Sequence, residues 1–478
     1  MSISCQPLAT DNRQTRAGTL IPLCILLLVW SSLLWLASAQ ASVDHSRWLK
    51  GPYSTGPDVT RACLACHQRQ AEDFSQDAHW NWIEEQELAG HREWVAMGKR
   101  NLLNNFCIGV PSNWPRCTSC HAGYGWEDES FDFSKLENID CLVCHDTTGD
   151  YRKAPTGAGH PEPGLDLTAI ARKVGRTSRI SCGSCHFFGG GGDHVKHGDL
   201  DSSLANPRRS QDVHMGVDGP DMSCQFCHQT RYHEIPGQAM SVSGGEGLRV
   251  ECGGCHRGTP HDDATLDRHS RSVACQTCHI PSFANSFPTK VWQDWSHAGE
   301  ERTLQQGEGI PTFTKNQGEM RWEQSVIPTY AWYNGQSARY LPGDRIEPAQ
   351  PVLELTRPLG DITQEEARIH PFKVMEGKQP FDVENRYLVI PKLYRGFWEH
   401  YDWDRAIREG MSKTDLDYSG RYDFIHTRMY WRINHMVVPK EAALQCDDCH
   451  SESGRLDWKA LGYPGDPIDT GSRTLQGR

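Results

Sequence analysis

Residues 141–155 read CLVCHDTTGDYRKAP, and this stretch decides what kind of fold the chain can adopt. It opens with Cys141 and Cys144, followed at once by His145, and it carries Lys153 eight residues beyond that histidine. Cysteines three residues apart lie close together on one face of a helical turn, and the next residue stands beside them. The pattern therefore indicates a metal-containing group that is held by two thiols and one imidazole.

The same pattern, Cys-x-x-Cys-His, occurs eight times in the 478-residue chain. The first to eighth motifs are 63–67, 117–121, 141–145, 182–186, 224–228, 252–256, 275–279 and 446–450. Such motifs attach c-type haem, because the cysteines form thioethers to the porphyrin while the histidine binds the iron. Cysteine pairs also make zinc sites, but zinc needs the pairs to meet in fours and does not explain a histidine after every pair. We therefore predict eight covalently bound haem c groups.

The motifs identify the haem-binding residues one by one. The predicted attachment residues are Cys63, Cys66, Cys117, Cys120, Cys141, Cys144, Cys182, Cys185, Cys224, Cys227, Cys252, Cys255, Cys275, Cys278, Cys446 and Cys449. The predicted proximal iron ligands are His67, His121, His145, His186, His228, His256, His279 and His450. A six-coordinate electron-transfer haem also needs a second axial ligand. For this role we predict His79, His197, His214, His233, His261, His269 and His435, with His91, His194, His297 and His426 as reserves.

The N-terminus has the features of a secretory signal peptide. Two arginines precede an apolar run from Leu20 to Ala39, and the run ends in small residues, ASAQA, that suit a signal peptidase. An uncleaved membrane anchor is the alternative, because about 20 apolar residues can span a bilayer. We expect cleavage of 1–41 and a periplasmic body at 42–478. Cleavage would also remove two of the three cysteines outside the motifs, Cys5 and Cys24.

The composition favours a body built around haems. Only 37% of the residues are hydrophobic, against roughly 45–50% in typical soluble domains on a count that includes glycine. Eight porphyrins can supply the missing apolar surface. Glycine and proline are frequent between the motifs, which favours short helices joined by loops. We predict a single, mainly α body with much irregular loop and few short β-strands, packed around eight haems, with seven motifs in 63–279.

Residues 281–445 separate the seventh motif from the eighth and contain no haem motif. VIPTYAWYNG and PVLELTRPLG are typical of short strands, and GFWEHYDWDRAIREGM is typical of a helix. The segment is rich in tryptophan, with Trp292, Trp295, Trp322, Trp332, Trp398, Trp403 and Trp431. We predict that it wraps and buries haem edges within the same body, and that the eighth motif at 446–450 returns to the other seven.

Lys153 matters because an amine is an unusual ligand for iron. A lysine must lose its proton before it can bind a metal ion, and from a reference pKa near 10.4 this costs about 4.6 kcal/mol at pH 7, whereas histidine is mostly neutral there. An amine-ligated iron is therefore a special site, which only a particular function would justify.

Several segments together resemble the octahaem tetrathionate reductase family of periplasmic cytochromes c. They are AHWNW, CTSCHAGYGW, CLVCHDTTGDYRKAP, CGSCHFFGGGGDHVKHGD, CQTCHIP and NHMVVPKEAALQCDDCH, and the likeness spans nearly the whole chain after residue 41. It implies that the catalytic haem is attached to Cys117 and Cys120 and that Lys153 binds its iron. The other seven haems of that family are bis-histidine. Whether Lys153 replaces His121 or opposes it stays open.

Three further residues are candidates for the catalytic site. Cys107 lies ten residues before the second motif and is the only cysteine after residue 41 that stands outside a motif. It is either an inert buried thiol or a thiol that exchanges with a sulfur–sulfur bond near the catalytic haem. Tyr124 and Asp146 flank the second and third motifs, and we predict that they supply protons.

The resemblance implies reduction of tetrathionate to two thiosulfates, with nitrite and hydroxylamine reduction as related activities. The partners it implies are a small oxidised sulfur or nitrogen substrate and a periplasmic or membrane quinol-linked electron donor. Two alternatives are a pure electron-transfer cytochrome with eight saturated irons and an oxidase akin to octahaem hydroxylamine oxidoreductases. The net charge of −12 argues against nucleic acid as a partner. The oligomeric state is left open.

Overall fold

The computed structural model of the chain describes residues 44–88, 94–239, 249–303, 305–307 and 309–473. The chain divides into two units, Met1–Asp44 and His45–Arg478, and the helices and strands below belong to the second. The predicted signal peptide at 1–41, its two cysteines and the reserve histidine His91 lie outside the described residues. Within the described residues, no helix is both long enough and apolar enough to cross a membrane.

All eight Cys-x-x-Cys-His motifs contain a helical turn. They lie on α2 (Gly56–Phe74), α4 (Trp114–Cys117) with η2 (Thr118–Cys120), α5 (Leu142–His145), α7 (Arg179–His186), α8 (Cys224–Cys227), η5 (Cys252–Gly254), α10 (Cys275–His279) and η9 (Cys446–Asp448). Thr55 and Asp58 form a capping box that starts α2. The backbone of α2 leaves helical geometry at His67, with φ −116° and ψ 32°. This helix therefore bends at the motif histidine.

The remaining helices are short and connect the motifs or border the sheet. They are α3 (Ala78–Asn81), α6 (Leu167–Arg172), α9 (Ala264–His269), α11 (Trp398–His400), α12 (Trp403–Met411), α13 (Pro467–Thr470), η1 (Lys99–Asn101), η3 (Leu136–Asn138), η4 (Ser202–Ala205), η6 (Trp295–His297), η7 (Leu393–Phe397) and η8 (Lys440–Ala442). An aspartate side chain caps the N-terminus of α3, α6, α9, α12 and α13. Such caps satisfy backbone N–H groups that short helices leave free.

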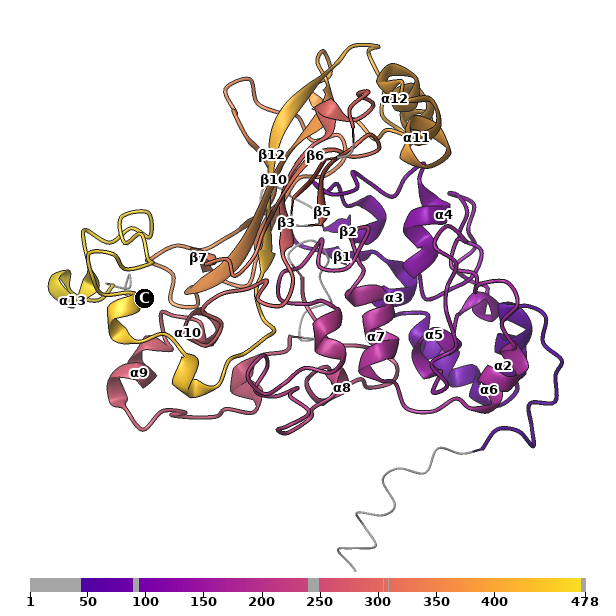
Figure 1. Cartoon of the computed structure of the whole chain (residues 1–478), viewed down its shortest axis with the longest axis horizontal. Helices are drawn as coiled ribbons and strands as arrows, with labels where there is room; N and C mark the ends of the chain where they lie inside the picture. Colours follow the sequence, from indigo (N-terminus) through magenta and orange to yellow (C-terminus); the bar gives the residue numbers. More distant parts are fainter. Residues whose placement is uncertain (1–43, 89–93, 240–248, 304, 308, 474–478) are drawn as a thin grey trace, which may run out of the picture. The chain divides into compact units, whose positions relative to one another are not determined.

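The segment after the seventh motif forms a ten-stranded sheet. Its main path runs β4 (Gln305–Gly307), β5 (Ile310–Thr314), β6 (Gly318–Glu323), β3 (Thr289–Asp294), β10 (Arg368–Asp382), β12 (Tyr422–Arg432), β9 (Leu353–Pro358) and β8 (Ser337–Arg339). Two further strands, β7 (Thr329–Tyr333) and β11 (Tyr387–Leu388), pair with β10. A separate hairpin joins β1 (Glu84–Gln86) to β2 (Val95–Met97). Figure 1 shows the large sheet with α5, α7, α8 and α10 following one another beside it.

This sheet corrects the expectation of a mainly α fold with few short strands. Helix makes up 26% of the chain and strand 19%, and β10 alone is 15 residues long. The sequence signal is weak because β10 contains Pro371, Gly377 and Pro380, which read as strand breakers. Most of β10 is also buried on both faces, so the alternation of apolar and polar residues that marks a half-exposed strand is lost.

The sheet and the N-terminal segments share one hydrophobic cluster. Leu103 and Phe106 pack with Met375 of β10 and with Met429 and Trp431 of β12. The Trp295 indole donates to the carbonyl of Asn105 at 3.1 Å. The loop that carries Cys107 is therefore fixed against the sheet before it reaches the second motif.

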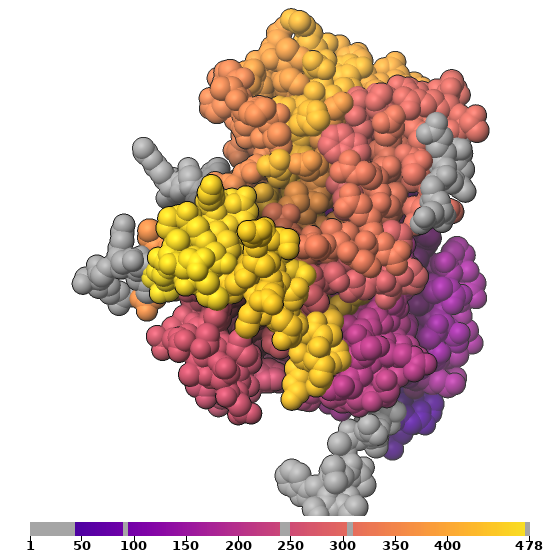
Figure 2. Space-filling view, turned by 60° about the vertical axis from the view of Figure 1, so that its left-hand side comes forward, coloured from indigo at the N-terminus to yellow at the C-terminus, as the bar shows by residue number. Residues whose placement is uncertain are grey.

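The C-terminal segment lies against the seventh motif. Val438 N donates to His279 O, and Leu444 N donates to Cys278 O, both at 3.0 Å. Figure 2 shows these C-terminal residues, in yellow, over the rose-coloured segment that contains the sixth and seventh motifs. The eighth motif thus follows the seventh in space although a long stretch of chain separates them.

Candidate haem and active sites

Seven of the eight motif histidines face a second histidine ring. The ring centroids are 6.4 Å apart for His67 and His45, 6.3 Å for His145 and His233, 5.9 Å for His186 and His79, 6.5 Å for His228 and His435, 6.0 Å for His256 and His214, 6.2 Å for His279 and His261, and 6.1 Å for His450 and His269. Metal–imidazole bonds are about 2 Å long, so two imidazoles on opposite sides of one metal ion have centroids about 6 Å apart. The spacing fits seven bis-histidine haems.

Six of the seven histidines predicted as distal ligands stand in these pairs: His79, His214, His233, His261, His269 and His435. The structure does not bring His197 to a motif histidine; its ring packs against Trp431 at 5.3 Å. His45 stands beside His67 instead. Because His45 lies eighteen residues before Cys63, next to the predicted cleavage site, no local spacing signal marks it.

The reserve histidines within the described residues have other neighbours. His194 stacks on Phe287, and His297 bonds Glu300 through Nδ1 at 2.8 Å. His426 packs against Trp292. None of them is needed to complete a pair.

His121 of the second motif is placed differently from the other motif histidines. Its Nε2–H donates to the carbonyl of Trp80 at 2.7 Å, and its side chain is fully buried. Five aromatic rings surround it at centroid distances of 4.9–6.1 Å, those of Trp80, Trp82, Trp126, Phe131 and Phe133. Burial lowers the pKa of His121 to about 3, so the ring is neutral. The imidazole is therefore held inside this cage of aromatic rings.

Lys153 reaches the second motif from the loop that follows the third. Its Nζ donates to the carbonyl of His121 and lies 2.9 Å from Asp140 Oδ2, and only 9% of the side chain is exposed. The backbone that holds it is paired across the loop, because Lys153 bridges Pro161 and Ala154 N donates to His160 O at 2.9 Å. A lysine amine and the backbone of the second motif are therefore brought together.

Asp140 is the centre of a buried hydrogen-bond network that the sequence analysis missed. Its Oδ1 accepts from the Tyr124 hydroxyl at 2.7 Å and from Val143 N at 3.1 Å. Its Oδ2 accepts from the Tyr151 hydroxyl at 2.7 Å, beside the Lys153 amine. Burial and the negative charge of Asp140 raise the pKa of both tyrosines well above the ordinary value. Both phenols therefore remain protonated and keep donating to the carboxylate.

Asp146, which was predicted to supply protons, holds the loop that follows the third motif. Its carboxylate accepts from Thr148 N at 2.8 Å, Gly149 N at 3.0 Å and Tyr151 N at 3.3 Å. A side chain that accepts from several following N–H groups fixes a turn. Asp146 thus positions the loop 146–153, while Tyr124 belongs to the network around Asp140.

Cys107 lies next to Cys117, with Arg116, Lys290 and Lys99 near the pair. The positive charges of these three side chains lower the pKa of Cys107, whereas burial raises it. Lys290 on β3 is only 2% exposed, and its Nζ donates to the amide oxygens of Gln293 at 2.9 Å and Gln317 at 3.4 Å. Burial lowers the pKa of Lys290 to about 7. Positive charge therefore gathers on one side of the second motif.

Contacts between cysteines show which motifs are neighbours. The thiols of the first and third motifs meet at Cys63 and Cys141, and those of the second and fourth at Cys120 and Cys185. The fourth motif also meets the fifth, and the sixth meets the seventh, through the pairs Cys182–Cys224 and Cys252–Cys275. Cys227 and Cys255, and Cys278 and Cys449, are near enough for each charge to affect the other. A continuous row of motifs therefore leads from the eighth to the fourth, where the second and third join it.

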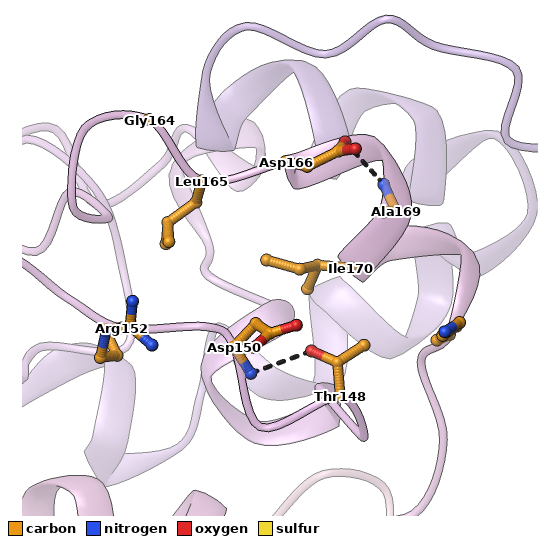
Figure 3. A pocket seen from close by; sticks show the side chains of 9 residues that line it. Thr148, Asp150, Arg152, Gly164, Leu165, Asp166, Ala169 and Ile170 are labelled. Carbon is orange, nitrogen blue, oxygen red and sulfur yellow. Dashed lines mark hydrogen bonds between the residues drawn. The ribbon is translucent and has the colours of Figure 1, made fainter.

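A hollow of about 240 Å³ is lined in part by Thr148, Asp150 and Arg152 of the loop that carries Lys153. Figure 3 shows two hydrogen bonds at its edge, in which Asp150 N donates to Thr148 Oγ1 at 3.0 Å and Ala169 N donates to Asp166 Oδ1 at 2.9 Å. Arg152 and Lys173 line the same hollow. Neither Lys153 nor any histidine lines it, so it is separate from the candidate active site.

Comparisons with known proteins agree with this geometry. Two family models match: cytochrome c554 and c-prime at residues 62–146, and bacterial cytochrome c at residues 290–453. A crystal structure of an octaheme cytochrome c from Shewanella oneidensis is 48% identical, with a TM-score of 0.86, covering 91% of this chain and 100% of that one. An uncharacterized protein from Archaeoglobus fulgidus is 23% identical over 258 residues, covering 44% of this chain and 86% of its own length. The multihaem cytochrome c fold and the covalently bound haem c groups are confirmed.

Proposed function

Because the chain belongs to the octahaem cytochrome c family, we propose that it is a periplasmic multihaem reductase. Seven bis-histidine haems carry electrons, and the haem on Cys117 and Cys120 reduces a small oxidised sulfur or nitrogen compound. Tetrathionate is the first candidate substrate, followed by nitrite and hydroxylamine. A quinol-linked donor outside the cytoplasm supplies the electrons, and the predicted signal peptide at 1–41 accounts for export.

One observation carries this proposal: the second motif differs from the other seven. A pure electron-transfer protein needs eight saturated irons, and the seven histidine pairs at 5.9–6.5 Å can saturate only seven of them. His121 has no such partner among the described residues, because its ring is buried in the aromatic cage. Lys153 is the side chain held beside this motif. The arrangement supports replacement of His121 by Lys153 as the ligand of this iron.

The residues around Lys153 can stabilise its neutral amine, which is the form that binds iron. Cys117 and Cys120 would hold the haem at this motif, which would supply electrons and an iron for the substrate to bind. Lys153 binds only as the neutral amine, and Asp140 Oδ2 at 2.9 Å is placed to take the released proton or to balance the positive charge left behind. The hydroxyls of Tyr124 and Tyr151 keep the Asp140 carboxylate in position.

The other side of the motif suits an anionic substrate. Lys290 is buried beside amide groups and carries no carboxylate partner among the described residues. A buried ammonium without a counter-ion gains free energy when an anion binds to it. Lys196 is a second amine near Cys120, and burial lowers its pKa to about 8. These amines support nitrite or tetrathionate over neutral substrates.

Cys107 offers a route for cleaving a sulfur–sulfur bond. Its thiolate can displace one thiosulfate from tetrathionate, so that a Cys107–sulfur bond forms as the central sulfur–sulfur bond breaks. Two electrons then release the second thiosulfate and restore the Cys107 thiolate. The nearby charges of Arg116, Lys290 and Lys99, which lower the pKa of Cys107, favour the thiolate that this step requires.

A ligand titration and one variant test the proposal. Nitrite, cyanide or hydroxylamine should perturb the spectrum of one haem in eight, and reduced protein should be reoxidised by tetrathionate or nitrite. Lys153→Ala should keep eight haems by mass and slow reoxidation at least about 100-fold, because the ligand that defines the open iron is lost. Lys135→Ala, at a mainly exposed lysine, is the matched control.

The outcomes separate the alternatives. A wild-type spectrum that no ligand perturbs would mean eight saturated irons and a pure electron-transfer protein. Reoxidation of Lys153→Ala at the wild-type rate would remove Lys153 from the mechanism. Faster turnover with hydroxylamine as electron donor than with any acceptor would indicate an oxidase.

A further inference from the structure

Four of the seven histidine pairs are backed by an aspartate. The Nδ1–H of His79 donates to Asp77 Oδ1 at 2.8 Å, and that of His435 donates to Asp199 Oδ2 at 3.2 Å. The Nδ1–H of His261 donates to Asp267 Oδ1 at 3.0 Å, and that of His450 donates to Asp466 Oδ1 at 2.6 Å. The four pairs belong to the fourth, fifth, seventh and eighth motifs.

These carboxylates are fixed in place by backbone groups. Asp77 also accepts from His79 N and Ile235 N, each at 2.8 Å. Asp199 accepts from Asn434 N at 2.7 Å and His435 N at 3.0 Å. Asp267 and Asp466 likewise accept from His261 N and Ile468 N, at 3.2 and 2.9 Å. These backbone N–H donors hold the four carboxylates against the imidazoles that they face.

The other three pairs have weaker acceptors or none. His145 Nδ1–H donates to a neutral carbonyl, Gly175 O, at 2.8 Å. His214 Nδ1 is 4.0 Å from Asp212 Oδ1, which is too far for a hydrogen bond. The Nδ1 of His45 is buried and has no hydrogen-bond partner within the described part of the chain. The seven pairs therefore differ in the negative charge placed behind their rings.

The charge behind an imidazole affects the metal in front of it. A carboxylate that accepts the Nδ1–H of a ligating histidine makes the ring more basic and more electron-rich. An electron-rich ligand favours oxidised over reduced iron. Hydrogen bonds to axial histidines therefore tune the reduction potential of the haem. We propose that Asp77, Asp199, Asp267 and Asp466 lower the reduction potentials of the haems on the fourth, fifth, seventh and eighth motifs. In this chain they are positioning residues, since they act on iron through histidines.

A hydrogen-bond acceptor behind the second histidine of a pair should lower the reduction potential further. In the fifth and eighth motifs both rings of the pair are bonded, because His228 donates to Pro236 O at 2.7 Å and His269 to Thr265 O at 2.8 Å. These two haems should have the lowest potentials. The haem between His45 and His67 should have the highest potential of the seven, since no residue of the described segments accepts a hydrogen bond from either ring.

The expected potentials do not change steadily along the row of motifs. The aspartate-backed motifs lie on both sides of the sixth, whose His214 is too far from Asp212 for a hydrogen bond, and the fourth meets the second at Cys185 and Cys120. The step from the sixth motif to the fifth should therefore be uphill for an electron. This inference goes beyond the proposed reductase activity and does not depend on it.

Potentiometric titration of the holoprotein tests the inference, followed by visible and electron paramagnetic resonance spectra. Asp466→Asn keeps an oxygen acceptor but removes the charge, so one of the eight one-electron components should move to higher potential while all low-spin signals remain. Asp199→Asn should do the same for a second component. Asp132→Asn, at an aspartate that bonds only Ser134 and Lys135 on the surface, should move none.

The result that overturns the inference is an Asp466→Asn protein with intact low-spin signals and unchanged or lowered potentials. If Asp199→Asn disturbs the loop 434–437 and a low-spin signal is lost, the Asp466→Asn result alone tests the inference, because Asp466 is the N-cap of a short C-terminal helix outside the sheet. The test measures reduction potentials and does not depend on tetrathionate turnover. A protein without reductase activity can therefore still confirm or overturn the inference.

Discussion

Replacement of Lys290 by methionine should make the protein more stable and its substrate binding weaker. Lys290 is 2% exposed, and burial lowers its pKa to about 7 from a reference value of 10.5. Since one pKa unit corresponds to about 1.4 kcal/mol, keeping this amine protonated at pH 6 costs the fold about 5 kcal/mol. Methionine removes the charge but leaves the Gln293 amide oxygen without its donor, which costs about 1–3 kcal/mol. We expect Lys290→Met to raise the free energy of unfolding by about 2–4 kcal/mol.

Thermal unfolding by calorimetry measures this gain. An unfolding entropy of about 2.1 cal/mol/K per residue amounts to about 1.0 kcal/mol/K for a chain of 478 residues, so the melting temperature should rise by about 2–4 °C at pH 6. The folded pKa lies below the unfolded one, so the cost is fully present below pH 7 and disappears as the pH rises toward 10.5. The advantage of the variant should shrink over the same range.

Steady-state kinetics measures the functional loss. A hydrogen bond from an ammonium to a bound anion contributes about 1.5–3 kcal/mol, so KM for nitrite or tetrathionate should rise about 10- to 100-fold. Lys413→Met is the matched control, because this half-exposed lysine pairs with the exposed Glu129 at 3.3 Å and should lose at most about 1 kcal/mol with no change in KM. A Lys290→Met protein that melts at lower temperature and keeps its KM would refute the reasoning.

Three further predictions concern single residues. His45→Ala should convert one low-spin haem to high spin in optical and resonance spectra, whereas His197→Ala should leave all low-spin signals, because only His45 faces a motif histidine; equal effects of the two variants would contradict this. In the wild type, KM for nitrite should rise as the pH passes through about 7, because Lys290 loses its proton there, and a flat profile would exclude Lys290 as the anion-binding group. Tyr151→Phe removes one of the two phenol donors to Asp140. A hydrogen bond to a charged group contributes about 1.5–3 kcal/mol, so the melting temperature should fall by about 2 °C. An unchanged melting temperature would show that the network does not stabilise the fold.

Short-range features of the fold could be predicted from the sequence because their causes are local. Cys-x-x-Cys-His needs one helical turn, and every motif contains one. The helix expected in GFWEHYDWDRAIREGM appears as α11 and α12, and the strand expected in PVLELTRPLG appears as β9. The sequence also led us to expect the return of the eighth motif, and Leu444 N bonds Cys278 O of the seventh.

Long-range features could not be predicted because nothing in one segment encodes its partner. β10 pairs with β12, β3, β7 and β11, and the first of these pairings joins residues about 50 positions apart. The pairing of His45 with His67 depends on how the chain enters α2, and the GDHVKHGD segment made His197 look equally suitable. The Asp140 network is hidden for the same reason, since Tyr124, Tyr151 and Lys153 converge on it only after the loops fold.

The second motif shows why identical motifs need not give identical sites. Its five motif positions match the pattern of the other seven, so the difference must come from what surrounds them. Trp80 lies on α3 and Trp82 directly follows it, while Trp126, Phe131 and Phe133 follow the motif. Together they enclose a neutral imidazole whose Nε2–H donates to a backbone carbonyl. Withdrawing His121 from this cage would expose apolar rings and leave that carbonyl unpaired, each at a cost of about 1–3 kcal/mol. The same packing that makes His121 unavailable leaves Lys153 and Asp140 beside the motif, so the proposed exchange of ligands would have its cause in the aromatic residues around His121.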